Sequence, residues 1–123
     1  LPGDDHKSMQ ETLDLSMELC TIGWNAYAAM PLPGSQLYKN AVLAKQKLPE
    51  DYAGYSFHAY NTQPLPTEHL TPAEVLKFRD EAWTKYHTYE PFLEKVENKF
   101  GKIARDNIEK MTEVKLKRKI LGD

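Results

Sequence analysis

The sequence contains a single cysteine, Cys20, among its 123 residues. One thiol excludes a disulfide framework within the chain, and it excludes an all-cysteine zinc or iron–sulfur site built from this chain alone. We expect Cys20 to be buried and to pack as a small hydrophobic residue. The sequence also lacks an apolar run of membrane-spanning length, so we expect a cytoplasmic protein with no membrane partner.

Neither sign of charge is in large excess, since 16 lysines and arginines face 18 aspartates and glutamates. A nucleic-acid-binding domain is usually strongly basic, so we expect no nucleic-acid partner. Basic residues gather only in the run "KLKRK", Lys115–Lys119. Such a run can bind a nucleic acid or a membrane. We favour cations in a last helical turn, which offset the helix dipole and keep a terminus hydrated.

Recognisable catalytic motifs are missing as well. The sequence has no Walker-type phosphate loop, no Gly-x-Ser-x-Gly elbow and no Rossmann fingerprint. Its four histidines, at positions 6, 58, 69 and 87, do not include a pair one helical turn apart, which is the common metal-binding spacing. The sequence therefore predicts neither a catalytic residue nor a metal ligand in this chain.

Most of the sequence has helical periodicity, with apolar residues recurring every three or four positions. Local start and stop residues divide it into helices, such as the capping box "TPAE" at Thr71–Glu74. The helices are expected from Asp4 or Asp5 to before Gly23, from Gly34 or Ser35, from Thr71, from Pro91 to Gly101, and from Ile103 towards Leu121.

The stretch "WNAYAAM", residues 24–30, has a different pattern, the period of two of a strand, in which Trp24, Ala26, Ala28 and Met30 alternate with Asn25, Tyr27 and Ala29. Small residues on both faces predict a strand buried between the layers of a parallel sheet covered by helices. Pro31 and Pro33 follow, and neither can donate to a strand ladder. A lone strand cannot satisfy its amides and carbonyls, so we expect neighbouring strands from elsewhere, or a homodimer formed through the exposed strand.

Residues 48–70, which we call the aromatic loop, are rich in aromatic side chains, proline and polar residues. A loop of this length in a compact domain is often a lid or a binding loop. Its rings either seal the join between two layers or line a pocket whose other wall lies outside this chain. The candidate side chains are Tyr52, Tyr55, Phe57, His58 and Tyr60.

Three stretches in this order, "LPGDDHKSMQETLDLSMEL", "AAMPLPGSQLY" and "LPEDYAGYSFHAY", resemble the closing part of radical S-adenosylmethionine enzymes of the cobalamin-binding class. In that family a Gly-Leu-Pro-Gly-Glu-Thr-like turn follows the fifth strand of a partial (β/α) barrel, and Leu1–Asp5 is similar to it. A Pro-x-Pro-Gly-Thr-x-Leu-Tyr turn follows the sixth strand, and Pro31–Tyr38 is similar to it. Ser35 stands where threonine is commoner, and either hydroxyl can cap a helix.

The resemblance implies a fold that is mainly α with one or two strands. Residues 1–47 would be the closing βα segment of a (β/α)6 half-barrel, residues 48–70 a connecting loop, and residues 71–123 a helical C-terminal extension. Because the chain opens at Leu1 on the expected strand-to-helix turn and without a methionine, we expect it to be cut from a longer parent protein. Its partners would be the upstream domains of the parent and the parent's small-molecule substrate.

The resemblance also implies cofactors in the parent: a [4Fe-4S] cluster on a CxxxCxxC motif, S-adenosylmethionine and cobalamin. Cys20 alone cannot hold the cluster, and the cobalamin-binding histidine motif is absent. By position at the carboxyl ends of the strands, the cofactor-side residues would be Leu1, Pro2, Met30 and Pro31. The aromatic loop would lie on the substrate side of an Fe–S oxidoreductase, methyltransferase or cyclase. The alternative is a non-catalytic helical module that binds a partner protein.

Overall fold

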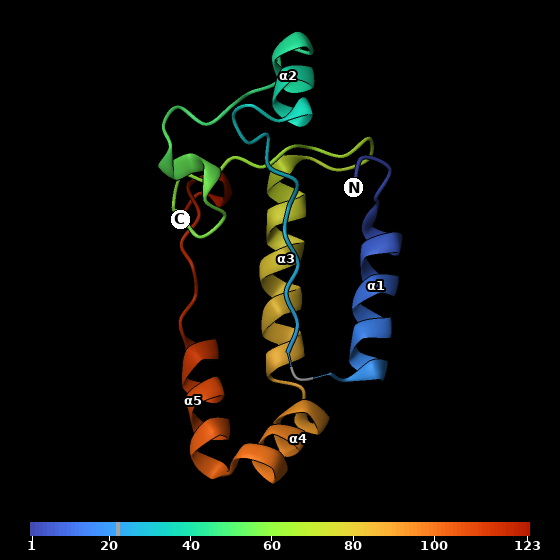
Figure 1. Ribbon diagram of the computed structural model, residues 1–123, viewed down its shortest axis with the longest axis vertical. Coiled ribbons are helices and arrows are strands. Elements are labelled where there is room, and N and C mark those ends of the chain that lie inside the picture. The colour runs from blue at the N-terminus through green and yellow to red at the C-terminus, as the bar shows by residue number, and fades with distance from the viewer. Residues whose placement is uncertain (22) are drawn as a thin grey trace. The chain divides into compact units, whose positions relative to one another are not determined.

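The computed structural model describes residues 1–21 and 23–123, and the regular structure of this part of the chain is entirely helical (Figure 1). None of its helices is both long enough and apolar enough to cross a membrane. The described residues form five α-helices and two short 3-10 helices: α1 His6–Leu19, α2 Gln36–Leu43, η1 Ala53–Tyr55, α3 Pro72–His87, α4 Glu90–Phe100, α5 Lys102–Glu113 and η2 Lys119–Leu121.

The chain divides into two compact units. Unit 1 contains residues 1–5, 27–79 and 116–123, and unit 2 contains residues 6–26 and 80–115. Helix α3 therefore supplies its first half to unit 1 and its second half to unit 2. The boundaries of the two units differ from the expected ranges 1–47, 48–70 and 71–123. Residues 1–47 and 71–123 are each divided between the units, and residues 116–123 lie in the same unit as the aromatic loop.

Helix starts follow the local residues that predicted them. The backbone N–H of Tyr38 donates to the Ser35 hydroxyl over 3.1 Å, which makes Ser35 the N-cap of α2. At the start of α3 the Thr71 N–H donates to Glu74 Oε2 (2.8 Å) and the Glu74 N–H donates to Thr71 Oγ1 (3.3 Å), as a capping box requires. Gly101 separates α4 from α5 at φ +86°, a backbone conformation that other residues rarely adopt.

The predicted strand is wrong, and with it the closing βα units of a partial barrel. Residues 23–30 have no regular secondary structure, and no sheet exists among the residues that the structure describes. In unit 1 the carbonyl of Ala29 accepts a hydrogen bond from the Leu65 N–H (2.8 Å). Leu65 stands between Pro64 and Pro66, which have no N–H to donate, so this neighbour cannot supply the repeated donors of a strand ladder.

The last helix is shorter than predicted. Helix α5 ends at Glu113, and the backbone of Val114 and Arg118 is extended (ψ +109° and +111°). Over this stretch the exposed lysines at 115, 117 and 119 alternate with other residues, and Arg118 is buried. The run "KLKRK" therefore does not form a last helical turn. Residues 115–118 follow α5 without regular secondary structure, and Lys119 begins η2; from Leu116 onward the run belongs to unit 1.

The core of unit 2 forms around Tyr86. Its hydroxyl donates to the carbonyl of Thr21 (2.9 Å), and its ring contacts those of Trp24 (centroids 6.2 Å apart) and Phe92 (5.1 Å). Burial raises the pKa of the Tyr86 hydroxyl. Cys20 is buried, as expected for a thiol that packs as a small hydrophobic residue. The other buried apolar residues of unit 2 are Leu13, Ala82, Leu93 and Val96.

The core of unit 1 contains the buried apolar residues of the first half of α3 together with residues from the loops. Two arginines, Arg79 and Arg118, are also buried in it. Helix α2 contributes little, since Ala41 is its one buried residue. The other buried residues of unit 1 are Ala28, Pro31, Gly54, Thr62, Pro64, Leu70, Val75 and Leu76.

Thr62 carries a buried hydroxyl that has no hydrogen-bond partner in the described part of the chain. Removing an unpaired buried polar group relieves a desolvation cost of about 1–3 kcal/mol. We therefore expect Thr62→Val, which keeps the side-chain shape, to raise the free energy of unfolding by about 1 kcal/mol in urea denaturation. The control is Thr112→Val, which removes a hydroxyl that donates to the Glu109 carbonyl (2.7 Å). A gain in the control equal to that in Thr62→Val would contradict the explanation.

Candidate functional site

The five expected substrate-side residues all lie in unit 1, and four of them form two ring pairs. Phe57 and His58 are in ring contact (centroids 4.3 Å apart), and Tyr52 and Tyr55 are 6.4 Å apart. Tyr52 leaves 86% of its surface exposed, and Tyr60 and His58 are exposed too. Phe57 and Tyr55 are half-buried. The loop therefore presents several of its rings to solvent.

Phe57 is the packing centre of the aromatic loop. The Tyr27 ring meets it edge-on with centroids 4.5 Å apart, and the Arg79 guanidinium carbon lies 4.8 Å from the Phe57 centroid. A cation over an aromatic face is attracted by the negative charge of that face. Tyr27 was expected in a strand, and its place beside Phe57 comes from the tertiary structure. Tyr27, Phe57 and His58 therefore form one aromatic cluster in unit 1, in which Phe57 is half-buried and Tyr27 and His58 are exposed.

Arg118 is a central residue of this site, although the sequence shows it only as one cation of the run "KLKRK". Its side chain is completely buried, and its Nη1 donates to the carbonyls of Phe57 (2.6 Å) and Ala59 (3.2 Å). A charged donor to a carbonyl makes a stronger hydrogen bond than a neutral donor does. The local pattern does not reveal this burial, because Leu116, two residues earlier and on the same face of an extended segment, is 39% exposed.

Asp51 holds the first turn of the loop. Its carboxylate accepts from the Gly54 N–H (3.0 Å) and from the Asn61 side-chain amide (3.1 and 3.2 Å). The turn is tight, since a Cβ on Gly54 would lie 2.7 Å from the Cβ of Pro49. Hydrogen bonding, first from the Gly54 N–H and then from Asn61, lowers the pKa of Asp51 below its ordinary value of 3.8.

This lowered pKa predicts a dependence of stability on pH. The ionised Asp51 is favoured in the folded state, so its contribution is present above pH 3.8 and is lost as the pH falls through the lower pKa of the folded state. We expect the free energy of unfolding, measured in urea, to fall as the pH is lowered from about 5 to about 2.5. The fall should be less steep for Asp51→Asn than for the unsubstituted 123-residue chain. Parallel pH profiles for the two proteins would contradict this role of the carboxylate.

The four expected cofactor-side residues do not surround a barrel mouth, because the chain has no such barrel in its described part. Leu1 is exposed, and the Pro2 carbonyl accepts from the Glu68 N–H (2.8 Å). The Met30 carbonyl accepts from the Leu32 N–H (2.9 Å) within a turn, and Pro31 is buried. Pro2 is thus held by the end of the aromatic loop, and Met30 and Pro31 follow Ala29, which is bonded to the same loop at Leu65.

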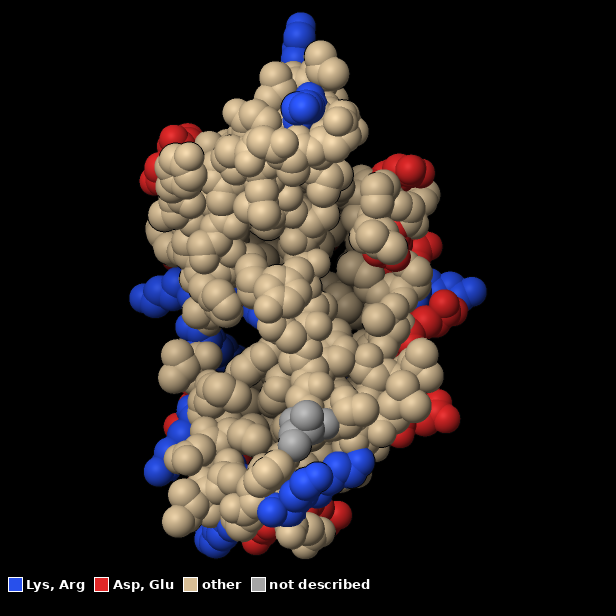
Figure 2. Space-filling view, viewed as in Figure 1, with Lys and Arg blue, Asp and Glu red and all other residues tan. Residues whose placement is uncertain are grey.

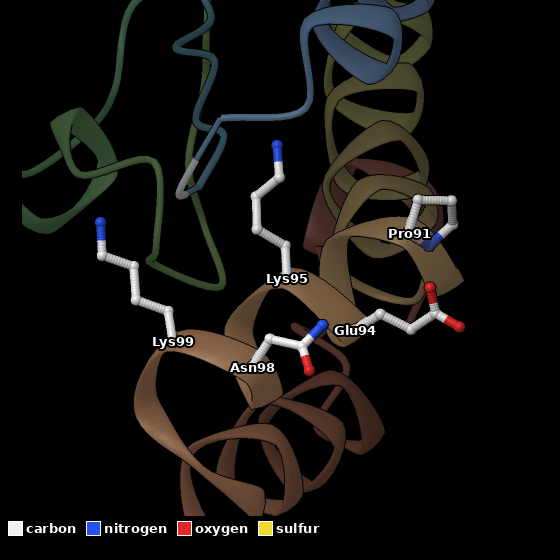
Figure 3. Close-up of a pocket in the computed structure, with 5 residues that line it drawn as sticks. All are labelled: Pro91, Glu94, Lys95, Asn98 and Lys99. Atoms are coloured by element: carbon white, nitrogen blue, oxygen red, sulfur yellow. The ribbon is translucent and has the colours of Figure 1, made fainter.

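Unit 2 carries an open depression on one face of α4 (Figure 3). All the residues that line it come from this helix: Pro91, Glu94, Lys95, Asn98 and Lys99. The lining mixes one carboxylate with two cations, and the Lys95 ammonium donates to the Cys20 carbonyl just after α1. With all its residues on a single helix and no enclosing second wall, this depression does not have the form of a catalytic pocket.

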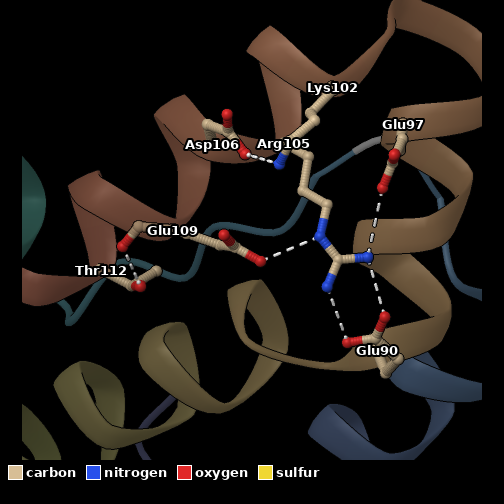
Figure 4. A network of polar contacts seen from close by, with 7 residues as sticks. All are labelled: Glu90, Glu97, Lys102, Arg105, Asp106, Glu109 and Thr112. Carbon is tan, nitrogen blue, oxygen red and sulfur yellow. Dashed lines mark hydrogen bonds and ion pairs between the residues drawn. The ribbon is translucent and has the colours of Figure 1, made fainter.

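A network centred on Arg105 connects α4 to α5 (Figure 4). The guanidinium pairs with both oxygens of Glu90 (2.8 and 3.0 Å), with Glu109 (2.9 Å) and with Glu97 (3.4 Å). Hydrogen bonding from Arg105, to Glu90 first, raises the pKa of the guanidinium. The bidentate pair and the shared cation stabilise the α4–α5 hairpin. We assign this network to structure rather than to chemistry.

Within residues 1–21 and 23–123 there is no group of three or more histidine, cysteine, aspartate or glutamate side chains that could hold a metal ion. Comparison with protein-family models, with curated proteins and with solved structures gives no match for this chain. The choice of a candidate site therefore depends on geometry. The aromatic loop is the best candidate for a binding site, because hydrogen bonds hold its backbone while several of its rings are exposed.

Proposed function

We propose that this chain is the carboxy-terminal, non-catalytic part of a cobalamin-class radical S-adenosylmethionine enzyme that acts in the cytoplasm. In this proposal the upstream domains of the parent hold the cluster, S-adenosylmethionine and cobalamin, and carry out an oxidoreductase, methyltransferase or cyclase reaction. This chain supplies the substrate side through the aromatic loop. The order of the three motifs in the sequence supports the proposal. The proposal does not include the barrel strands that were expected in this chain, because the described residues form no strand.

The observation that carries the proposal is the state of the aromatic loop. Its backbone is held by the buried Arg118 and by Asp51, whereas Tyr52, His58 and Tyr60 remain exposed. A binding surface needs such preorganisation, because side chains on an ordered backbone lose less entropy when a ligand binds. Figure 2 shows few charged atoms over the middle of unit 1 on the face it presents, as suits an uncharged aromatic or apolar contact.

The exposed apolar side chains of both units give further support. Eight large side chains leave more than half of their surface exposed in the described chain, besides those of the aromatic loop and Phe100. They are Leu1, Leu15, Leu19, Tyr27, Leu32, Leu43, Ile103 and Val114. In the proposal, the upstream domains of the parent cover part of these side chains, since apolar surface that gathers into a patch is typical of sites where other protein binds.

The test uses the full reading frame of the parent, reconstituted anaerobically with iron and sulfide. We expect a bound cluster, seen by its iron content and absorption, and cleavage of S-adenosylmethionine to 5′-deoxyadenosine. Deletion of residues 1–123 should leave the cluster bound and abolish cleavage. Tyr52→Ala, an exposed change in the loop, should lower cleavage by about tenfold, the equivalent of 1.4 kcal/mol. The exposed control Phe100→Ala should leave cleavage unchanged.

A full protein without a cluster would reject the enzyme and leave the second candidate, a helical module that binds a partner protein. Helix α5 favours this candidate. It has no buried residue, and it exposes Ile103 and Met111 on a strongly amphipathic helix. Such a face is typical of a helix that packs on another protein. If the full protein binds a cluster but its Tyr52→Ala and Phe100→Ala variants cleave S-adenosylmethionine at equal rates, only the role of the aromatic loop would be rejected.

A further inference from the structure

The segment Leu116–Asp123, which we call the strap, crosses the aromatic loop in unit 1. Four hydrogen bonds join them over residues 57–60. The Arg118 guanidinium donates to the carbonyls of Phe57 and Ala59, and the Lys119 N–H donates to the Tyr60 carbonyl (2.8 Å). The Tyr60 hydroxyl in turn donates to the Asp123 carbonyl (2.8 Å). The contacts run in both directions, so each segment satisfies polar groups of the other.

The strap also holds its own shape. The Arg118 N–H donates to Asp123 Oδ2 (2.7 Å), and the Asp123 N–H returns to the Arg118 carbonyl (3.3 Å). Between them η2 forms one 3-10 turn, which ends at Gly122 with φ +87°. A turn that is closed at both ends holds the Arg118 guanidinium in one orientation. The guanidinium then bonds to the same two carbonyls and does not exchange between different acceptors.

Burial makes these contacts strong. Arg118 is the largest completely buried side chain of the chain, while Lys117 and Lys119 on either side of it are exposed. A buried charge is expensive unless it is fully hydrogen-bonded, so the guanidinium needs the two loop carbonyls as much as they need a donor. On its other side the loop is held through the Phe57 ring, which packs on Tyr27 and Arg79.

We infer that the strap is a positioning device for the aromatic loop, that Arg118 is its positioning residue, and that release of the strap frees the loop backbone at Phe57–Tyr60. The inference deepens the proposed function, since the strap would set the substrate-side surface. Its test does not depend on that function, because it measures the order of the loop in the chain as it stands. Failure of the enzyme proposal and failure of this inference are therefore distinguishable.

The test is amide hydrogen exchange on the complete 123-residue chain. Three amides report on the strap and loop: those of Ala59 (bonded to Ser56), Thr62 (bonded to Ala59) and Lys119 (bonded to Tyr60). In Arg118→Met we expect them to exchange at least about tenfold faster, because each lost charged hydrogen bond is worth about that factor. The amides of α4 should keep their rates. Lys117→Met, the same change at the exposed neighbour, should leave all of these rates unchanged.

Arg118→Lys separates positioning from a general loss of stability. Its ammonium keeps the charge but lacks the planar fork of the guanidinium, so exchange at Ala59 and Thr62 should be intermediate. Unchanged exchange in a folded Arg118→Met, or equal acceleration in α4, would overturn the inference. If Arg118→Met does not fold, Tyr60→Phe, which removes only the bond to Asp123, should accelerate the Lys119 amide. Wild-type exchange there would also overturn the inference.

Discussion

Replacing Phe92 by alanine is expected to lower the free energy of unfolding by about 3–5 kcal/mol, because the change removes a large side chain from a packed core and leaves a cavity. Phe92 is 1% exposed. Its ring lies 5.1 Å from that of Tyr86 and 5.4 Å from that of His87, measured between centroids, within unit 2. His87 also bonds through Nδ1 to the Trp83 carbonyl (2.8 Å), so the cavity would open beside a buried polar group.

The control for this prediction lies on the same helix. Phe100, at the end of α4, is 54% exposed, and the Lys99 ammonium lies 5.9 Å from its ring centroid. Phe100→Ala makes the same chemical change with little loss of burial, so we expect a cost below about 1 kcal/mol. Urea denaturation followed by far-ultraviolet circular dichroism measures both variants. If Phe92→Ala and Phe100→Ala lower the free energy of unfolding equally, Phe92 is not part of a packed core in unit 2.

The second large effect is expected in unit 1. Leu76 is completely buried in the first half of α3, and Leu76→Ala should lower the free energy of unfolding by about 2–5 kcal/mol. Alanine is a better helix former than leucine, so the loss is not attributable to helix propensity. It would measure how tightly α3 packs against the loops of its own unit.

Leu43 provides the matched control for Leu76. It ends α2 and is 81% exposed, so Leu43→Ala should change the free energy of unfolding by less than about 0.5 kcal/mol. The same urea titration applies to both variants. A small effect of Leu76→Ala would contradict the packing of unit 1 described above. A large effect of Leu43→Ala would contradict the exposure of this side chain at the end of α2.

Helix positions were predictable because their determinants are local. The Thr71 and Glu74 side chains bond to backbone groups three residues away, and Ser35 does the same for Tyr38. Gly101 ends α4 through its own backbone conformation. The burial of Cys20 followed from its residue type, since a free thiol packs as a small hydrophobic residue. None of these interactions needs information from more than one or two helical turns away.

The strand at residues 24–30 was not predictable in the same way. Its alternating pattern is real, since Ala28 is buried and its neighbour Tyr27 is exposed. A strand, however, also needs donors and acceptors from a second segment. The segment bonded to Ala29 is the proline-flanked Leu65, which offers one N–H. The aromatic loop was identified as a candidate site from its composition, and its substrate-side role stays a prediction.

The sequence by itself determined the helices α1 to α4, the start of α5 and the aromatic composition of the loop, because caps, glycines and apolar spacing act over a few residues. Only the tertiary structure decided that residues 24–30 form no strand and that α5 ends at Glu113. It also decided that Arg118 is buried. That guanidinium bonds to the carbonyls of Phe57 and Ala59, about 60 positions earlier in the chain. A partner so distant in sequence leaves no local pattern, and only folding brings the two segments together.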